Sequence, residues 1–333
     1  MAPKRIAIVG ATGAVGMELL KVLEQRNFPM KTLSLFASAR SKGKKLNCKG
    51  ENIAVQELTA SSFKGIDTAF FCAGASVSRQ FAPIAVKNDC VVIDKSSAFR
   101  MNKDVPLVVP EVNPHAIALH KGIIASPNCS TIQMVVALKP LHDYSRIKRL
   151  IATTFQSVSG AGARAIEEMK SETLAILAGK PFNRSIFKHQ IAFNAIPQID
   201  VFGEDAYTGE ETKMSEETKK IMEDDAMKIS ATCVRIPVFR SHSESINVEF
   251  EKELTAEKAR KLFAKAPGIE LQDDVSRQIY PLATIAANKD LVYVGRLRRD
   301  NTVKYGLAMW VVSDNVRKGA ALNAVQILEN LKI

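Results

Sequence analysis

Cys129 has the sequence surroundings of a catalytic thiol. It follows the apolar run 123–125 and the tripeptide Ser126-Pro-Asn128, and it precedes the apolar helical stretch 132–141. This pattern predicts a strand, a turn and then a helix that begins near Cys129. A helix N-terminus favours a thiolate through its dipole and its free N–H groups, and the same groups together with the Asn128 amide could hold an oxyanion. The chemistry indicated is nucleophilic attack by sulfur on an acyl group.

A thiol nucleophile needs a partner that accepts and donates protons, and His242 is the best placed of the five histidines. It follows the strand-like run 232–239, in the segment Arg235-Ile-Pro-Val-Phe-Arg-Ser-His242, and it stands beside several cations. The sequence does not determine how far His242 lies from Cys129 in space. A loop histidine that only caps a strand end is the alternative interpretation.

Other polar residues stand where strands are expected to end. Gln156 precedes the glycine-rich segment 157–162, and Arg100 lies just beyond the apolar run 91–94. The carboxyl ends of strands are where open α/β sheets bind ligands. Arg100 and Arg235 could each bind an oxyanion through two parallel hydrogen bonds, although surface arginines are common.

Three glycines near the start of the chain predict a nucleotide site. Gly10, Gly13 and Gly16 form the pattern GxxGxxG between an apolar strand, 6–9, and a helical stretch, 17–23. Glycines let the backbone approach a pyrophosphate, and the helix N-terminus binds its negative charge. A tight turn without a ligand is the alternative.

The end of the second expected strand discriminates between cofactors. An NAD site usually has Asp or Glu there, roughly 20 residues beyond the glycines, to accept from the ribose hydroxyl. This chain has Ser38, Arg40 and Ser41 instead. An arginine with two hydroxyls suits a 2′-phosphate, so NADP is predicted, and a solvated basic loop is the alternative.

Composition limits the remaining classes. The 333 residues include 46 Lys and Arg against 35 Asp and Glu, a formal charge of +11 that favours anionic partners such as nucleic acid, phosphorylated metabolites or phosphate-bearing cofactors. The five cysteines are widely spaced, without a CxxC pair or a histidine nearby, which argues against a disulfide framework and a metal site. With no signal-like or membrane-spanning stretch, we expect a cytoplasmic protein.

The order of elements predicts two domains. Up to about residue 126, short strands alternate with helices, which is typical of a Rossmann-like doubly wound parallel sheet. Longer strands of alternating polarity follow, which predict an α+β domain with a mixed, largely antiparallel sheet, and a charged stretch, 203–228, is expected to be a surface loop and helix. A last helix is expected at 315–331. The expected strands are 6–9, 32–36, 68–72, 91–94, 107–109, 123–125, 151–158, 232–239, 245–250, 291–297 and 303–312.

Seven motifs in order closely resemble those of bacterial-type aspartate-semialdehyde dehydrogenases: GATGAVG, SSAFR, PNCS, FQSVSGAG, ETKK, RIPVFRSHSE and SDNVRKGAALNAVQ. The resemblance implies NADPH-dependent reduction of L-aspartyl 4-phosphate to L-aspartate 4-semialdehyde, with release of phosphate, through a cysteine thioacyl intermediate. This reaction leads to diaminopimelate, lysine, threonine, methionine and isoleucine. The resemblance also implies that the last helix returns to the first domain, so that residues 1–127 with 315–333 form the NADP-binding domain. Residues 128–314 then form the catalytic domain, which makes a homodimer, and a tetramer stays open.

Residue roles follow from the same resemblance. Cys129 resembles the family's nucleophile, His242 its general acid and base, and Gln156 the residue that orients the acyl group. The substrate-binding positions that match are Arg235 for the α-carboxylate, Glu217 for the amino group, and Arg100 with Lys220 for the phosphate. The positions that match cofactor contacts are Thr12, Gly13, Ala14, Val15, Arg40, Ser41, Ser159, Gly160 and Asn315. Ser241 stands where relatives often carry Gly, which leaves the local loop shape open.

Three alternatives remain. N-acetyl-glutamyl-phosphate reductase uses the same kind of cysteine, but it typically has Gly where Asn128 stands here. Glyceraldehyde-phosphate dehydrogenase would carry an acidic residue at the end of the second strand. A non-catalytic, basic NADP-sensing or nucleic-acid-binding protein would use the positive charge directly, but aromatic residues make up only 6% of the chain and are not interleaved with a basic run.

Overall fold

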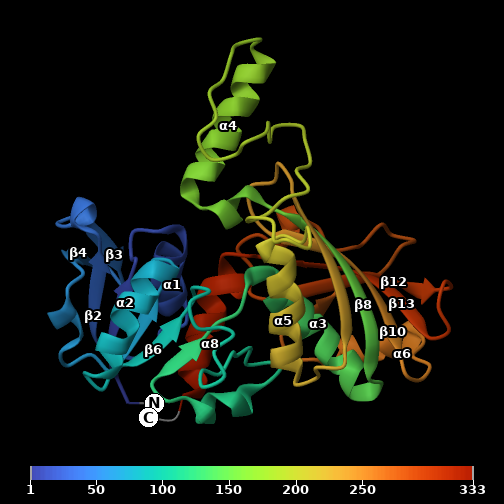
Figure 1. The fold of residues 1–333 in the computed structure, drawn as a ribbon, viewed down its shortest axis with the longest axis horizontal. Coiled ribbons are helices and arrows are strands. Elements are labelled where there is room, and N and C mark those ends of the chain that lie inside the picture. Colours follow the sequence, from blue (N-terminus) through green and yellow to red (C-terminus); the bar gives the residue numbers. More distant parts are fainter. Residues whose placement is uncertain (1, 332–333) are drawn as a thin grey trace. The chain divides into compact units, whose positions relative to one another are not determined.

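The computed structural model describes residues 2–331, which form two compact units (Figure 1). The first unit contains Met1–Asn128 and Ala320–Ile333, and the second contains Cys129–Gly319. Met1, Lys332 and Ile333, which fall in the expected nucleotide-binding domain, lie outside the described residues.

The first unit is built on a seven-stranded sheet with the order β3-β4-β2-β1-β5-β6-β7. Neighbouring strands are parallel except for the hairpin β3–β4. Strands β2, β4 and β3 lie on one side of β1, and β5, β6 and β7 lie on the other. The predicted doubly wound sheet is therefore confirmed. Its strands are β1 (Lys4–Val9), β2 (Met30–Ala37), β3 (Lys45–Cys48), β4 (Glu51–Glu57), β5 (Thr68–Phe71), β6 (Val91–Asp94) and β7 (Ile123–Ala125).

Helices cover both faces of this sheet. Helices α1 (Ala14–Gln25) and α8 (Asn323–Asn330) share one hydrophobic cluster with Ile6 and Ile8 of β1. Helix α2 (Ala75–Val86) belongs to the cluster on the other face, around Val9 and Phe71. Burial on both faces explains why the central strands are continuous apolar runs.

The second unit has a six-stranded sheet with the order β11-β12-β13-β10-β8-β9. The central pairs are antiparallel and the outermost pair on each side is parallel, which confirms the predicted mixed sheet. Its strands are β8 (Ile147–Gln156), β9 (Lys228–Arg235), β10 (His242–Phe250), β11 (Ile269–Leu271), β12 (Val292–Asp300) and β13 (Gly306–Ser313). Its helices are α3 (Cys129–Tyr144), α4 (Ala163–Leu177), α5 (Gly209–Met222), α6 (Ala256–Phe263) and α7 (Ala283–Ala286).

Strand register gathers several candidate site residues at one edge of this sheet. Gln156 pairs with Arg235 at the ends of the parallel strands β8 and β9. Strand β10 runs antiparallel to β8 and β13, so its first residue, His242, pairs with the last residue of β13, Ser313. The last residues of three strands therefore meet the first residue of β10.

Helix α4 and the segment that follows it project from the second unit (Figure 1). Two buried glutamates on one face of α4 hold this segment. Glu168 accepts three main-chain N–H groups, from residues 185–187, at 2.6–2.8 Å, and Glu172 accepts those of Ile191 and Ala192 at 2.9 Å. Burial raises the pKa of Glu168, but these hydrogen bonds outweigh burial and lower it overall.

Five expectations about elements differ from the structure. The basic loop after β2 leads into the hairpin β3–β4, and the expected strand 107–109 makes only a single bridge, from Leu107 to Ala125. Strand β9 ends at Arg235, just ahead of Pro237, which has no N–H to donate to a sheet. The last helix begins as a π-helix, Arg317–Leu322, and α5 buries one face rather than lying on the surface.

Candidate active site

The glycine turn of the first unit has the geometry of a phosphate-binding loop. Gly10 has φ of 87°, and an added Cβ would lie 2.9 Å from the Cys72 carbonyl carbon. A Cβ on Gly16 would lie 2.4 Å from the Gly10 oxygen, so both positions require glycine. Gly13 is the N-cap of α1, which begins with Ala14 and Val15 and has no side-chain cap. The helix therefore offers its first N–H groups to an anion.

The predicted 2′-phosphate residues lie next to this turn. The Thr12 hydroxyl is 3.3 Å from that of Ser41, which links the glycine turn to the loop after β2. Ser38 is the N-cap of the short 3₁₀ helix Ala39–Ser41, and the Arg40 side chain is exposed. The residues present therefore fit an anionic cofactor, with two hydroxyls and one cation around the turn.

Cys129 is the first residue of α3 and is half-buried. The helix follows β7 after three residues, as predicted. Gly319 packs against Cys129, since a Cβ at Gly319 would lie 2.9 Å from the Cys129 Cβ. The nucleophile candidate is thus held between a helix N-terminus and a chain segment that tolerates no side chain.

Arg235 contacts the edge of the sheet by a hydrogen bond and acts on Cys129 by its charge. Its Nη1 donates to the Ser157 carbonyl oxygen at 2.6 Å. Burial lowers the pKa of Arg235, against the opposing charges of Glu210 and Cys129, and a guanidinium nevertheless stays protonated. Arg235 is therefore a buried, fixed positive charge whose field reaches the Cys129 sulfur.

His242 lies in the same cluster. A Cβ on Gly160 would lie 2.8 Å from Arg235 Nη1 and 3.3 Å from His242 Nε2, so both side chains border the same small volume. The imidazole is fully buried, and its Nε2 has no hydrogen-bond partner among the described residues. Burial first, and then the charge of Arg235, lowers the pKa of His242 well below its ordinary value. The ring is neutral at physiological pH.

Gln156 is buried at the end of β8. Its Nε2 donates to Glu210 Oε1 at 3.2 Å and to Thr154 Oγ1 at 3.3 Å. Glu210 lies in the first turn of α5, and the capping box between Thr208 and Glu211 fixes this turn. The amide of Gln156 is therefore held by α5.

Helix α5 also carries two predicted substrate-binding residues, Glu217 and Lys220, one turn apart. Glu217 is buried and Lys220 is half-buried. Burial lowers the pKa of Lys220, and the charge of Glu217 partly offsets this. The two side chains thus supply opposite charges on one face of the helix.

Two predicted residues, Arg100 and Asn128, belong to the first unit and are buried there. Arg100 Nη2 donates to the Lys95 carbonyl oxygen at 2.9 Å. Asp94, the last residue of β6, fixes the loop that leads to Arg100. Its carboxylate accepts from the Ser96 and Ser78 hydroxyls at 2.8 Å.

The predicted cofactor-contacting residues of the second unit form one network. The Asn315 side chain accepts from the Ser241 main-chain N–H at 3.0 Å and bonds to the Ser159 hydroxyl. Gly160 follows Ser159 in the 3₁₀ helix Val158–Ala161. Ser241 has φ of 75°, in the left-handed region that favours glycine, which accounts physically for glycine as the common residue there.

Three buried polar residues of this site were missed by the sequence analysis: Ser157, Glu210 and Glu244. Glu244 lies two residues after His242, on the same face of β10, and burial raises the pKa of its carboxyl well above the ordinary value despite a contact with Gln133. The two-residue spacing along a strand was the available signal. Nothing in the sequence marked the contact of Ser157 with His242.

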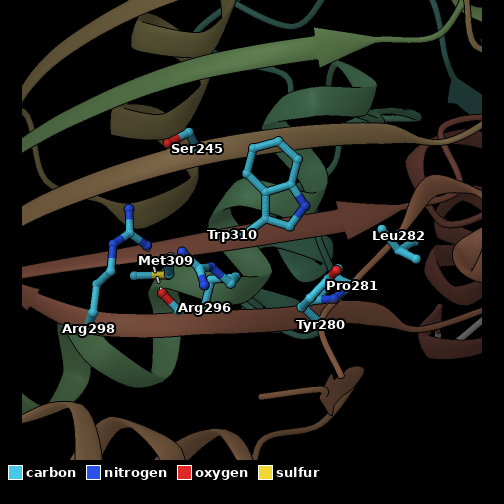
Figure 2. Close-up of a pocket in the computed structure, with 8 residues that line it drawn as sticks. All are labelled: Ser245, Tyr280, Pro281, Leu282, Arg296, Arg298, Met309 and Trp310. Atoms are coloured by element: carbon cyan, nitrogen blue, oxygen red, sulfur yellow. Dashed lines mark hydrogen bonds between the residues drawn. The ribbon is translucent and has the colours of Figure 1, made fainter. Parts of the chain in front are cut away.

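A separate hollow of about 560 Å³ lies on the sheet of the second unit (Figure 2). In that view Trp310 stands between the arginines and Leu282. No predicted catalytic or substrate-binding residue lines it. The lining residues are Ser245, Tyr280, Pro281, Leu282, Arg296, Arg298, Met309 and Trp310.

Residues 2–331 contain no cluster of three or more His, Cys, Asp or Glu side chains that could hold a metal ion. Within the same range, no helix is long and apolar enough to cross a membrane.

Two family models together match most of the chain. Residues 5–120 match the model described as semialdehyde dehydrogenase, NAD binding domain. Residues 138–318 match the model described as semialdehyde dehydrogenase, dimerisation domain. The first match covers the glycine turn, and the second covers Arg235 and His242.

Named proteins are similar over nearly the whole chain. An aspartate-semialdehyde dehydrogenase of Aquifex aeolicus is 57% identical over 331 residues, which cover 98% of this chain and 97% of the relative. That of Bacillus subtilis is 51% identical over 335 residues, with the same coverage.

Solved structures agree with this similarity. Aspartate semialdehyde dehydrogenase II of Vibrio cholerae, complexed with ASA, has a TM-score of 0.97 at 47% identity and covers 99% of this chain and 98% of that chain. An aspartate semialdehyde dehydrogenase of Candida albicans, solved with NADP, has a TM-score of 0.78 at 28% identity and covers 99% and 98%.

Proposed function

This chain belongs to the aspartate-semialdehyde dehydrogenase family, and we propose that it reduces L-aspartyl 4-phosphate to L-aspartate 4-semialdehyde with release of phosphate. The observation that carries the proposal is the buried guanidinium of Arg235 beside the neutral imidazole of His242 at Gly160, together with a helix-terminal thiol, Cys129, whose charge acts on Arg235. A thiol in this setting is suited to an acyl group that is already activated, so the reaction needs no metal.

Cys129 is the nucleophile in this mechanism. Its thiolate attacks the acyl carbon, a C–S bond forms, and the C–O bond breaks so that phosphate leaves with the electron pair. The positive end of the α3 dipole and the charge of Arg235 stabilise the thiolate. The product of this step is a thioester on Cys129.

His242 serves the second half of the reaction. NADPH, when bound, supplies the hydride that reduces the thioester. The reduced acyl carbon carries an oxyanion, and the unpartnered Nε2 of His242 is the group available to bind it or to exchange a proton with it. The oxyanion then re-forms the C=O bond, and Cys129 leaves as a thiolate.

The charged side chains suit the substrate. A molecule with a phosphate, a carboxylate and an ammonium needs two cationic sites and one anionic site. We assign Arg235 to the carboxylate, Glu217 to the ammonium, and Lys220 with Arg100 to the phosphate. Gln156 orients the acyl group, and Asn128 helps to hold the oxyanion.

The decisive test is phosphate-dependent reduction of NADP with aspartate semialdehyde. We expect activity in the wild type, less than about one-thousandth of it in Cys129→Ala, and wild-type rates in Cys48→Ala, a buried cysteine of β3. Activity with N-acetyl-glutamate semialdehyde, but none with aspartate semialdehyde, would support the rival reductase. An active Cys129→Ala variant would refute the mechanism.

The preferred cofactor is NADP rather than NAD, held by the turn Gly10–Val15 with Ser38, Arg40 and Ser41, and by Ser159, Gly160 and Asn315. Arg40→Ala should raise the KM for NADP by about tenfold and leave that for NAD unchanged, because one charge-assisted hydrogen bond contributes roughly 1.5–3 kcal/mol. Lys44→Ala removes an exposed cation from the same loop and is the matched control. Equal effects of Arg40→Ala on both cofactors would contradict the assignment.

We further propose a homodimer that forms through the sheet of the second unit, in the cytoplasm. The hollow around Trp310, rimmed by half-exposed Leu282, supports this surface, and five free thiols suit a reducing compartment. Leu282→Glu should halve the mass measured by light scattering, whereas Leu119→Glu, on an exposed part of the first unit, should not. A wild-type mass of four chains would identify a tetramer, and an unchanged dimer in Leu282→Glu would place the interface elsewhere.

A further inference from the structure

A polar layer behind His242 has no role in the mechanism above. Ser157 is fully buried, and its main-chain N–H donates to His242 Nδ1 at 3.0 Å. Its hydroxyl oxygen also lies 3.2 Å from the same nitrogen. Ser157 thus offers one ring atom both a donor and a potential acceptor.

The main-chain donor determines which ring nitrogen carries the proton. An N–H group can only donate, so Nδ1 must use its lone pair, and the single proton of the neutral imidazole must lie on Nε2. Register enforces this contact, because β8 and β10 pair antiparallel with Ser243 opposite Phe155. The other tautomer, with its proton on Nδ1, would lose the hydrogen bond from the Ser157 main-chain N–H at the end of β8.

The hydroxyl can serve the other protonation state. The Ser157 hydroxyl donates to Asn315 Oδ1 at 3.2 Å and lies 2.9 Å from the Ser159 hydroxyl. With its proton directed to these groups, its lone pairs face Nδ1. An imidazolium protonated at both nitrogens would lose the bond from the main-chain N–H, and its Nδ1–H would find this acceptor within reach.

We propose that Ser157 is a positioning residue for His242: its main-chain N–H fixes the neutral ring with the proton on Nε2, and its hydroxyl, oriented by Asn315, accepts the Nδ1–H of the charged ring. The inference rests on the role proposed for His242. Its consequence is that the resting ring presents an N–H donor to the substrate oxyanion and takes no proton from Cys129 at Nε2. The collapse of the oxyanion to aldehyde and thiolate then needs no net proton transfer, so protons and electrons balance in that step.

The charged groups around the ring come from several elements. Arg235 of β9 opposes the charged ring, and Cys129 at the start of α3 acts by its charge on Arg235. Burial raises the pKa of Glu244 on β10, Glu210 on α5 accepts from Gln156, and Asp314 after β13 is paired with Arg240. No fixed carboxylate contacts Nδ1 among residues 2–331, so the Ser157 hydroxyl is its acceptor.

The tautomer can be measured without catalysis. In protein labelled with ¹⁵N-histidine, with His242→Asn to assign the resonances, we expect a protonated Nε2 and an unprotonated Nδ1 at neutral pH. A proton on Nδ1 would overturn the proposal. If this pattern is found in an enzyme that does not act on aspartate semialdehyde, the proposed function fails while the tautomer assignment stands.

The hydroxyl is tested separately by kinetics. Ser157→Ala should move the acid limb of the kcat profile to lower pH by about one to two pH units, the shift expected when the charged ring loses one hydrogen bond, and should change kcat at neutral pH much less. Ser157→Thr should restore the acid limb, and Ser159→Ala, which removes a hydroxyl that does not contact the ring, should move the acid limb less. A merely structural role would lower the melting temperature and leave the pH profile in place. An unchanged acid limb in Ser157→Ala would refute the role of the hydroxyl.

Discussion

Gly160→Ala tests whether the volume bordered by Arg235 and His242 is the catalytic site. Gly160 lies in a 3₁₀ helix outside the left-handed region, so alanine can adopt its backbone conformation. The added methyl would lie 2.8 Å from Arg235 Nη1, where an ordinary contact requires at least 3.4 Å. The guanidinium must therefore move by about half an ångström or more, and the His242 ring, at 3.3 Å, must shift slightly as well.

Such a movement should cost activity and little stability. Arg235 Nη1 is fixed to the Ser157 oxygen at 2.6 Å, so the displacement stretches a hydrogen bond of a charged donor. A misplacement of about 1 Å can reduce a rate by about a hundredfold, so we expect kcat/KM for aspartate semialdehyde to fall by roughly tenfold to a hundredfold. The free energy of unfolding should change by less than about 1 kcal/mol, because alanine also restricts the unfolded chain.

The assay is steady-state kinetics with aspartate semialdehyde, phosphate and NADP, together with thermal melts. Gly203→Ala is the matched control, because its φ is also ordinary and its nearest neighbour is the flexible, exposed Asp205 side chain. It should retain wild-type kinetics. Wild-type kcat/KM in Gly160→Ala, or an increase confined to the KM for NADP, would refute the reasoning, since the methyl would then act on the cofactor alone.

Three further predictions concern stability. Ser241→Gly should raise the free energy of unfolding in urea by about 1 kcal/mol, because Ser241 has φ of 75° and a buried hydroxyl without a partner among residues 2–331; no gain would contradict this reasoning. Burial raises the pKa of Glu244, so above about pH 4.5 the carboxyl loses its proton in the unfolded chain before it does so in the folded protein. The free energy of unfolding should therefore fall as the pH rises from about 4.5 toward the folded-state pKa of Glu244. Glu244→Gln should weaken this fall in thermal melts between about pH 5 and pH 8, with the new amide beside Gln133 Oε1, and an unchanged slope would argue against it. Glu168→Gln should speed amide hydrogen exchange at residues 185–187 by roughly tenfold without changing exchange in β10, and equal acceleration in both segments would indicate global destabilisation instead.

The sequence predicted elements where one physical signal dominated. Strands β1, β5 and β6 are buried on both faces, and their apolar runs identified them and the fold class. The hairpin β3–β4 was missed because it lies at the sheet edge, where exposed charged and polar residues replace the apolar pattern. Helix α5 was expected on the surface because its composition is charged, yet it buries Glu210 and Glu217. A count of charges does not reveal which of them are paired.

The candidate site also contains residues that the sequence could predict and residues that it could not. The position of Cys129 at the start of α3 follows from local chain pattern, so it was predictable. The approach of His242 to Arg235 depends on the register of β8, β9 and β10, which brings together residues far apart in sequence. Family resemblance supplied the roles of Glu217, Lys220 and Asn315, and these stay predictions. Ser157 and Glu244 had no signal beyond their proximity to named motifs.

The positive charge of the chain acts at the site mainly through one buried residue. Of the buried side chains of the site, His242 is neutral because its pKa is lowered, and burial raises the pKa of the Glu244 carboxyl. Arg235 remains charged, and Glu210 partly balances it. In the proposed mechanism the thiolate of Cys129 is therefore stabilised by Arg235 and the N-terminus of α3 rather than by an imidazolium. The net charge of +11 then bears on the capture of anionic substrates, whereas the reactivity of the thiol depends on where this one guanidinium is fixed.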